Sequence, residues 1–154
     1  MLKPTWYLTD VDWYIQLPNA PQLAADGQAV IGQIAQLFHD ESYFNPAKTV
    51  ATTHVILLAA EHLGDVITYT AGQHNDTEVA RLIGGLNLIQ AHLTQIIQKL
   101  AEHTDQGGAF PGLTNRSAAD IKTITDSLCA AGASGEVCAG HLKEAHLALR
   151  STTK

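Results

Sequence analysis

One histidine and two carboxylates recur at helical spacing within an apolar segment. His54, Glu61 and Asp65 follow one another at intervals of seven and four residues, which on an α-helix places all three side chains on one face. Such a set could form a proton-transfer site, half of a metal site or a buried polar network. It could equally be the single solvated face of the helix, because acid–base catalysis also needs a cavity and shifted pKa values. An enzyme or ligand sensor built on this set could also use His62 or His92.

The histidines and cysteines of the chain match no standard metal motif. Di-iron bundles use Glu-x-x-His, and no glutamate of this chain has histidine three residues later. Cys138, His141 and His146 supply at most three zinc ligands, whereas a structural zinc site needs four. Nucleophile elbows and glycine-rich phosphate loops are missing as well. We therefore expect no metal and no cofactor, and the sequence leans away from an enzyme.

The N-terminal segment holds both tryptophans and two of the four tyrosines of the chain. Trp6 and Tyr7 precede a short helix predicted at about 10–16, and Trp13 and Tyr14 lie on it. These large side chains could close one open end of a helical bundle or contact a small molecule. They could also dock a protein partner or a second copy, since Trp and Tyr are enriched at interfaces. We take all four as candidate interaction residues.

The elements that must position these residues are predicted to be helices. The two longest, 46–71 and 76–103, are joined by a short polar connection, so we expect an antiparallel hairpin of the two at the centre of the fold. Asn45 and Pro46 suit the N-cap and first position of the former. The latter has the clearest hydrophobic stripe of the chain, which we expect to face the core. Its members are Val79, Leu82, Ile83, Leu86, Ile89, Leu93, Ile96, Ile97 and Leu100.

Three further helices are expected around this hairpin. One lies within 20–39, and another starts at Ser117 after a long loop at 104–116. The sequence GASG at 132–135 is expected to end that helix, and a fifth helix then runs toward the C-terminus. No segment shows the sustained alternation of a β-strand. The fold class is therefore all-α, a bundle of four to five helices.

The two cysteines flank the GASG sequence symmetrically. Cys129 and Cys138 would then lie opposite each other on two packed helices. Packed helices stand about 8–10 Å apart, and a disulfide needs Cα atoms closer than about 7 Å. We therefore expect both thiols to be reduced and to lie in the core.

Length and charge narrow the class of protein. A chain of 154 residues has the size of one common domain, so we expect a single helical-bundle domain over 1–154, with 1–18 as its aromatic N-terminal segment. The formal charge is −6, and residues 1–110 carry four Lys and Arg against eleven Asp and Glu. Phosphate binding depends on clustered Lys and Arg, so nucleic acid is disfavoured as a partner.

Hydropathy and the missing motifs lead to a first hypothesis of function. The N-terminus lacks an apolar run of signal-peptide length, and VILLAA at 55–60 is far shorter than a membrane span. We therefore expect a soluble cytoplasmic protein without membrane contact. The favoured function is a non-enzymatic bundle that binds another protein or itself, as an accessory, regulatory or immunity-type factor. The alternative is a small-molecule-binding or catalytic bundle with its polar site at His54, Glu61 and Asp65.

Overall fold

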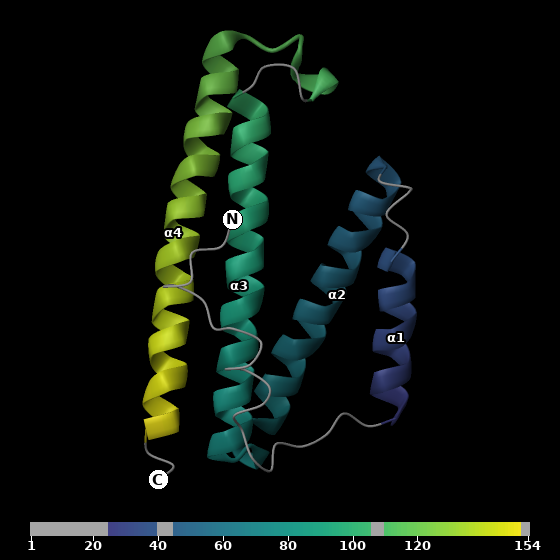
Figure 1. Ribbon diagram of the computed structural model, residues 1–154, viewed down its shortest axis with the longest axis vertical. Helices are drawn as coiled ribbons and strands as arrows, with labels where there is room; N and C mark the ends of the chain where they lie inside the picture. The colour runs from purple at the N-terminus through teal and green to yellow at the C-terminus, as the bar shows by residue number, and fades with distance from the viewer. Residues whose placement is uncertain (1–24, 40–44, 106–109, 152–154) are drawn as a thin grey trace. The chain divides into compact units, whose positions relative to one another are not determined.

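The protein is all-α throughout the residues that the structure describes, as the periodicity predicted. The computed structural model describes residues 25–39, 45–105 and 110–151. These ranges contain four α-helices, two short 3-10 helices and no strand (Figure 1). The predicted aromatic helix and its candidate interaction residues lie outside the described residues. The α-helices are α1 (Ala25–His39), α2 (Pro46–Thr70), α3 (Asp76–Asp105) and α4 (Ala118–Ser151).

The described residues fall into two compact units. One contains α1, α2 and the 3-10 helix η3 (Ala71–Gln73), and the other contains α3, α4 and the segment between them. The expected antiparallel partners 46–71 and 76–103 thus belong to different units, and their pairing stays a prediction, as does a single domain over 1–154. The long antiparallel hairpin of the structure is the one that α3 forms with α4 (Figure 1).

Helix α2 begins at the predicted cap. The Asn45 side chain accepts a hydrogen bond of 3.0 Å from the Lys48 amide, and Pro46 occupies the first turn. Threonine hydroxyls along the helix donate to the carbonyl four residues earlier, as Thr52 does to Lys48 at 2.8 Å. These bonds satisfy hydroxyl groups within an otherwise apolar sequence. No residue of α2 is buried, so the helix presents apolar side chains on an exposed surface.

Removing the Asn45 cap should loosen the first turn of α2. We expect Asn45→Ala to cost about 1 kcal/mol locally, because one helical N–H loses its acceptor. Amide hydrogen exchange near Lys48 would then accelerate about fivefold in the full-length protein. Asn45→Asp keeps an acceptor at the same place and should leave the exchange rate close to wild type. Equal rates in Asn45→Ala and wild type would contradict the role of the cap.

The α3–α4 hairpin is held together by small and polar residues. In its register Ala80 lies beside His146, Asn87 beside Ala139, and a side chain on Gly135 would meet Thr94. On α3 the residues that face α4 recur at alternating intervals of four and three, and six of the seven are buried. We call this row the hairpin seam: Ala80, Gly84, Asn87, Ala91, Thr94, Gln98 and Ala101.

The large aliphatic stripe of α3 is not the buried face, which corrects the expectation from sequence. None of its nine members is buried, and Ile89, Ile96 and Leu100 are exposed. Among the described residues, the buried hydrophobic side chains are all alanines, namely Ala80, Ala91, Ala101 and Ala139. Where the helices approach most closely, at Gly132 and Gly135, only small side chains fit between the backbones. The larger Asn87 and His146 are buried elsewhere along the contact, each with a hydrogen bond to the facing helix.

Helix α4 is continuous from Ala118 to Ser151, so the predicted break at GASG and the separate fifth helix are wrong. Gly132 and Gly135 are instead buried against α3: a Cβ on Gly132 would lie 3.1 Å from Cγ of Gln98, and one on Gly135 would overlap the Thr94 hydroxyl. These glycines allow contact between helices and do not reverse the chain.

Because α4 is continuous, the expectation that the two cysteines lie on different helices is also wrong. Cys129 and Cys138 lie on the same helix, nine residues and about 14 Å of helical rise apart, so they cannot bond to each other. Both are free, as expected, but they are exposed and not part of the core.

The connection into α4 is locally determined. It contains the 3-10 helix η4 (Pro111–Leu113), and the ring of Phe110 lies edge-on to His103 of α3 with centroids 6.0 Å apart. Ser117 caps α4 as predicted, because its hydroxyl oxygen accepts from the Asp120 amide at 3.1 Å. One turn later Lys122 donates to Asp126 at 2.9 Å, and this bond raises the pKa of the Lys122 ammonium.

Candidate functional site

Helix α3 carries a second row of residues with a seven-residue repeat. Its members recur at intervals of three and four residues over three heptads, which is the pattern of helices that pack in coiled-coil fashion. Unlike the hairpin seam, the row consists entirely of large aliphatic residues, and its exposed members include Ile89 at 49% and Ile96 at 48%. We call it the aliphatic seam: Val79, Leu82, Leu86, Ile89, Leu93, Ile96 and Leu100.

Buried hydrogen bonds between α3 and α4 hold α3 in one rotational orientation. They thereby fix the direction in which the aliphatic seam faces. Nδ1 of His146 lies 2.7 Å from the Ala80 carbonyl oxygen. Since a carbonyl only accepts, Nδ1 carries the proton, and Nε2 has no partner among the described residues. The Asn87 amide donates to the Ala139 carbonyl oxygen at 2.6 Å. Polar contacts of this kind specify a single register between two helices.

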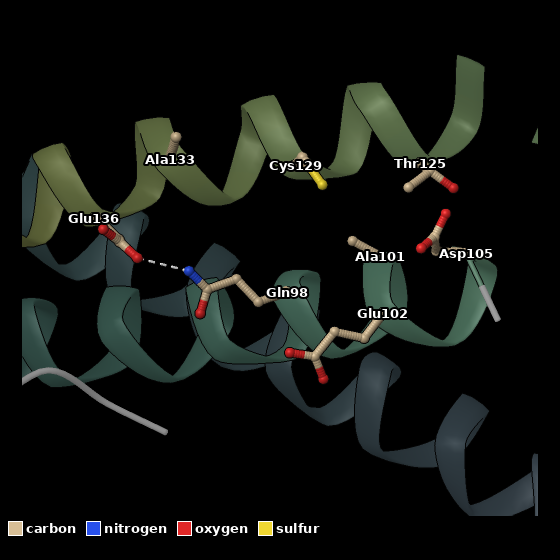
Figure 2. Close-up of a pocket in the computed structure, with 8 residues that line it drawn as sticks. All are labelled: Gln98, Ala101, Glu102, Asp105, Thr125, Cys129, Ala133 and Glu136. Carbon is tan, nitrogen blue, oxygen red and sulfur yellow. Dashed lines mark hydrogen bonds between the residues drawn. The ribbon is translucent and has the colours of Figure 1, made fainter. Parts of the chain in front are cut away.

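One side of the hairpin is hollowed into an open acidic groove of about 560 Å³. Figure 2 shows the lining residues of α3 and α4 and the bond of 2.7 Å that Gln98 donates to Glu136. Glu102 and Asp105 are the other carboxylates, and Cys129 lines the same groove. In the described part of the chain, no three His, Cys, Asp or Glu side chains are placed to hold a metal ion. The groove therefore gathers three carboxylates, those of Glu102, Asp105 and Glu136.

The aliphatic seam lies on the side of α3 that is turned away from α4. At 3.6 residues per turn its members point about 150–160° away from the hairpin seam, so Ile89 and Ile96 are directed away from α4. The seam is thus a face of α3 alone, and the half-buried Leu128, Leu142 and Leu149 of α4 recur in the heptad register of Gly135, which faces α3.

The polar set predicted from sequence lies elsewhere. His54, Glu61 and Asp65 share helix α2, as their spacing required, and all three are exposed. None of them lines the groove of Figure 2. His62 on α2 and His92 on α3 are exposed as well. The structure therefore supplies a common helix for the three groups, and their catalytic interpretation stays a hypothesis.

The two apolar features predicted from the sequence, the N-terminal aromatic residues and the aliphatic stripe of α3, have different outcomes. Trp6, Tyr7, Trp13 and Tyr14 lie outside the described residues, so their role as contacts stays a prediction. The aliphatic seam was found by its periodicity and was assigned to the core. The signal that would have corrected this is a second repeat with the same period, made mostly of small residues one or two positions further along, which marks a second packing face on the same helix.

Helix α2 raises the question of a lipid environment. Within the described residues, one helical stretch, Pro46–Gln73, is long and apolar enough by length and composition to cross a membrane. The core helix of a soluble protein can pass the same test. Glu61 lies within two residues of the middle of that stretch and Asp65 within six. A charged carboxylate at the bilayer centre costs about 2.5–3.5 kcal/mol. Glu61 would carry that cost if α2 crossed a membrane.

Known proteins give no lead to the function of this chain, so the chemistry of its surface is the guide. No family model, curated protein or solved structure matches the chain. Among the features described, the groove and the polar set on α2 offer charge without an organised centre. The aliphatic seam is apolar along its full length and stands on a helix held in one register. We therefore take the aliphatic seam of α3 as the candidate functional site.

Proposed function

We propose that the protein is a non-enzymatic helical protein that binds a protein partner through the aliphatic seam of α3. The observation that carries the proposal is the exposure of Ile89, Ile96 and Leu100 on a strict heptad. Burial of apolar surface contributes about 25 cal/mol per Å². A partner that buries the seven large aliphatic residues of the seam would therefore gain binding free energy. Contiguous exposed apolar surfaces on soluble proteins typically mark interaction sites.

The shape of the seam favours a helix as the binding element. The seam runs along about 32 Å of α3 and presents side chains at the i, i+3 and i+7 positions that helical partners use as anchors. Small molecules bind concave pockets that enclose most of their surface, whereas the seam is a row of side chains along one convex helix surface. A helical partner is therefore a better match than a small ligand.

The wider role we propose is that of an accessory, regulatory or immunity-type factor. Its support is the acidic composition, which disfavours nucleic acid, together with a sequence free of the catalytic motifs considered above. The N-terminal aromatics Trp6, Tyr7, Trp13 and Tyr14 are proposed as a second set of contacts for the same partner, because such side chains are frequent at the centres of interfaces.

Photo-cross-linking in the native cell tests this function. A benzophenone amino acid at Ile89 should capture a protein, whether another chain or a second copy. The matched control is Val137, which is 61% exposed and lies on the side of α4 away from α3. Adding Ile96→Glu to the Ile89 probe should abolish capture, because a charge would enter the buried centre of the interface. Capture at Ile89 no stronger than at Val137 would contradict the proposal.

A further inference from the structure

We propose that the connection from α3 to α4 forms a binding site for a small oxyanion, a carboxylate or phosphate group, held by Arg116 and His103. The site is a pocket of about 120 Å³ whose lining includes no residue of the aliphatic seam. The inference therefore goes beyond the proposed function and does not rest on it. The local construction of the pocket, its free hydrogen-bond donors, its charge and its size support it.

The pocket is built by the end of α3, the connection and the first turns of α4. Hydrogen bonds within the connection hold its walls. The Leu113 amide donates to the Phe110 carbonyl oxygen at 2.9 Å, and the Arg116 amide donates to that of Leu113 at 2.9 Å. The ring of Phe110 lies edge-on to His103, a packing that orients both rings. The pocket is therefore formed before any ligand arrives, as binding sites usually are.

The free hydrogen-bond donors of the pocket belong to Arg116 and His103. Both side chains are exposed, so a ligand can reach them from solvent. Within the described ranges, neither side chain has a hydrogen bond or an ion pair. The two threonine hydroxyls that line the pocket, those of Thr104 and Thr114, already donate to backbone carbonyl oxygens at 2.7 Å. A bound group must therefore accept hydrogen bonds from a guanidinium and an imidazole.

The pocket carries positive charge on an acidic protein. Its described lining contains no carboxylate, whereas Asp105, two residues after His103, lines two neighbouring grooves instead. Arg116 is always charged, and its planar fork of donors matches the paired oxygens of a carboxylate or a phosphate. A cation would meet no counter-charge among these side chains. The pocket therefore favours an anion.

The size of the pocket limits what it can hold. Sites for complete small molecules usually measure about 300–1,000 Å³, so about 120 Å³ suits a group of a few heavy atoms. Phe110, Leu113 and Ile121 complete the wall with apolar surface, and low local polarity strengthens a charged hydrogen bond. A free anion and the anionic end of a larger molecule present the same chemistry to such a site.

An NMR titration of the full-length, ¹⁵N-labelled protein tests the site. Inorganic phosphate and acetate, each added to about 50 mM against a chloride control of equal ionic strength, should give saturable amide shifts at Phe110, Thr114 and Arg116. Two charge-assisted contacts correspond to a dissociation constant on the order of 1 mM. Saturation by phosphate alone identifies a phosphate site, and saturation by acetate alone identifies a carboxylate site. Shifts that do not saturate with either anion would overturn the proposal.

Phenyl phosphate and benzoate distinguish the two sources of the anion. Binding about tenfold tighter than that of phosphate or acetate would indicate the end of a larger molecule, because the ring gains apolar contacts beyond the pocket. Equal or weaker binding would indicate a free anion.

Two substitutions that each remove one positive charge separate the pocket from general electrostatic attraction. Arg116→Gln should weaken binding about tenfold, because the charged fork is lost. The matched control is Lys122→Gln, since Lys122 lines a neighbouring groove and is bonded to Asp126. Its dissociation constant should stay within about twofold of wild type. Circular dichroism checks that both variants keep their helices. Equal weakening in both, or none in Arg116→Gln, would refute the site.

The role of His103 needs a variant that keeps its volume and one that keeps its donor. His103→Leu leaves an apolar side chain beside Phe110 and should weaken binding about threefold, because one donor is lost. His103→Gln restores a side-chain N–H and should bind within about twofold of wild type. Wild-type affinity in His103→Leu would show that the imidazole only forms a wall of the pocket.

Discussion

Replacing His146 with alanine is expected to lower the free energy of unfolding by about 2–4 kcal/mol, which would be the largest single effect in the hairpin. The imidazole is fully buried and is the largest fully buried side chain of the described residues. Alanine would leave a cavity between α3 and α4 and would remove the 2.7 Å contact of Nδ1 with the Ala80 carbonyl oxygen. Urea unfolding of the full-length protein, followed by circular dichroism, measures the change.

His141→Ala is the matched control on the same helix. Its side chain is 75% exposed, and its one described partner is Glu144 at 3.4 Å, so the expected change is within about 0.5 kcal/mol. The two substitutions remove the same atoms from α4 and differ only in burial and partner. Should both cost the same, the contact between His146 and Ala80 would not be what holds this end of the hairpin.

The helices themselves were predictable because local signals specify them. The predicted segments 46–71 and 76–103 agree within two residues with helices Pro46–Thr70 and Asp76–Asp105. Asn45 and Ser117 cap α2 and α4 as their side chains suggested. A cap or a hydrophobic period acts within one or two turns, so it can be found without knowing any partner helix.

The packing faces could not be predicted in the same way. Periodicity identifies rows of large apolar residues, and the usual inference places them inside, but α3 packs on α4 through alanine, glycine and threonine. Similarly, Gly132 and Gly135 are compatible with a turn or with a close helix contact, and only the position of Gln98 and Thr94 on the facing helix distinguishes the two. Such contacts are non-local, so the pattern of a single segment does not contain them.

The candidate site shows the same contrast between features that local sequence specifies and features that depend on other helices. The common helix of His54, Glu61 and Asp65 followed from spacing alone, and the structure confirms it. Whether such groups do chemistry depends on side chains from other elements, which spacing does not reveal. The aliphatic seam was visible as a pattern. Its exposure became visible only once α4 was seen to pack on the opposite face of α3.

The second large effect is expected at Gly135. A Cβ there would overlap the Thr94 hydroxyl and would lie 3.1 Å from Nε2 of Gln90 and 3.2 Å from Cβ of Thr94. Thr94 is fully buried and donates to the Gln90 carbonyl oxygen at 2.8 Å, so it has little room to move. We expect Gly135→Ala to destabilise the protein by about 1–3 kcal/mol through overpacking. Urea unfolding of the full-length protein measures it.

Two further glycines of α4 make this a graded test of close packing. Around Gly140 nothing lies within 4 Å of an added Cβ, so Gly140→Ala should stabilise the protein by about 0.5–1 kcal/mol, the ordinary gain of alanine over glycine in a helix. At Gly132 the added Cβ meets the flexible Gln98 side chain at 3.1 Å, so we expect an intermediate result. If all three alanine variants were stabilised alike, α3 and α4 would not approach each other as closely as the hairpin seam requires.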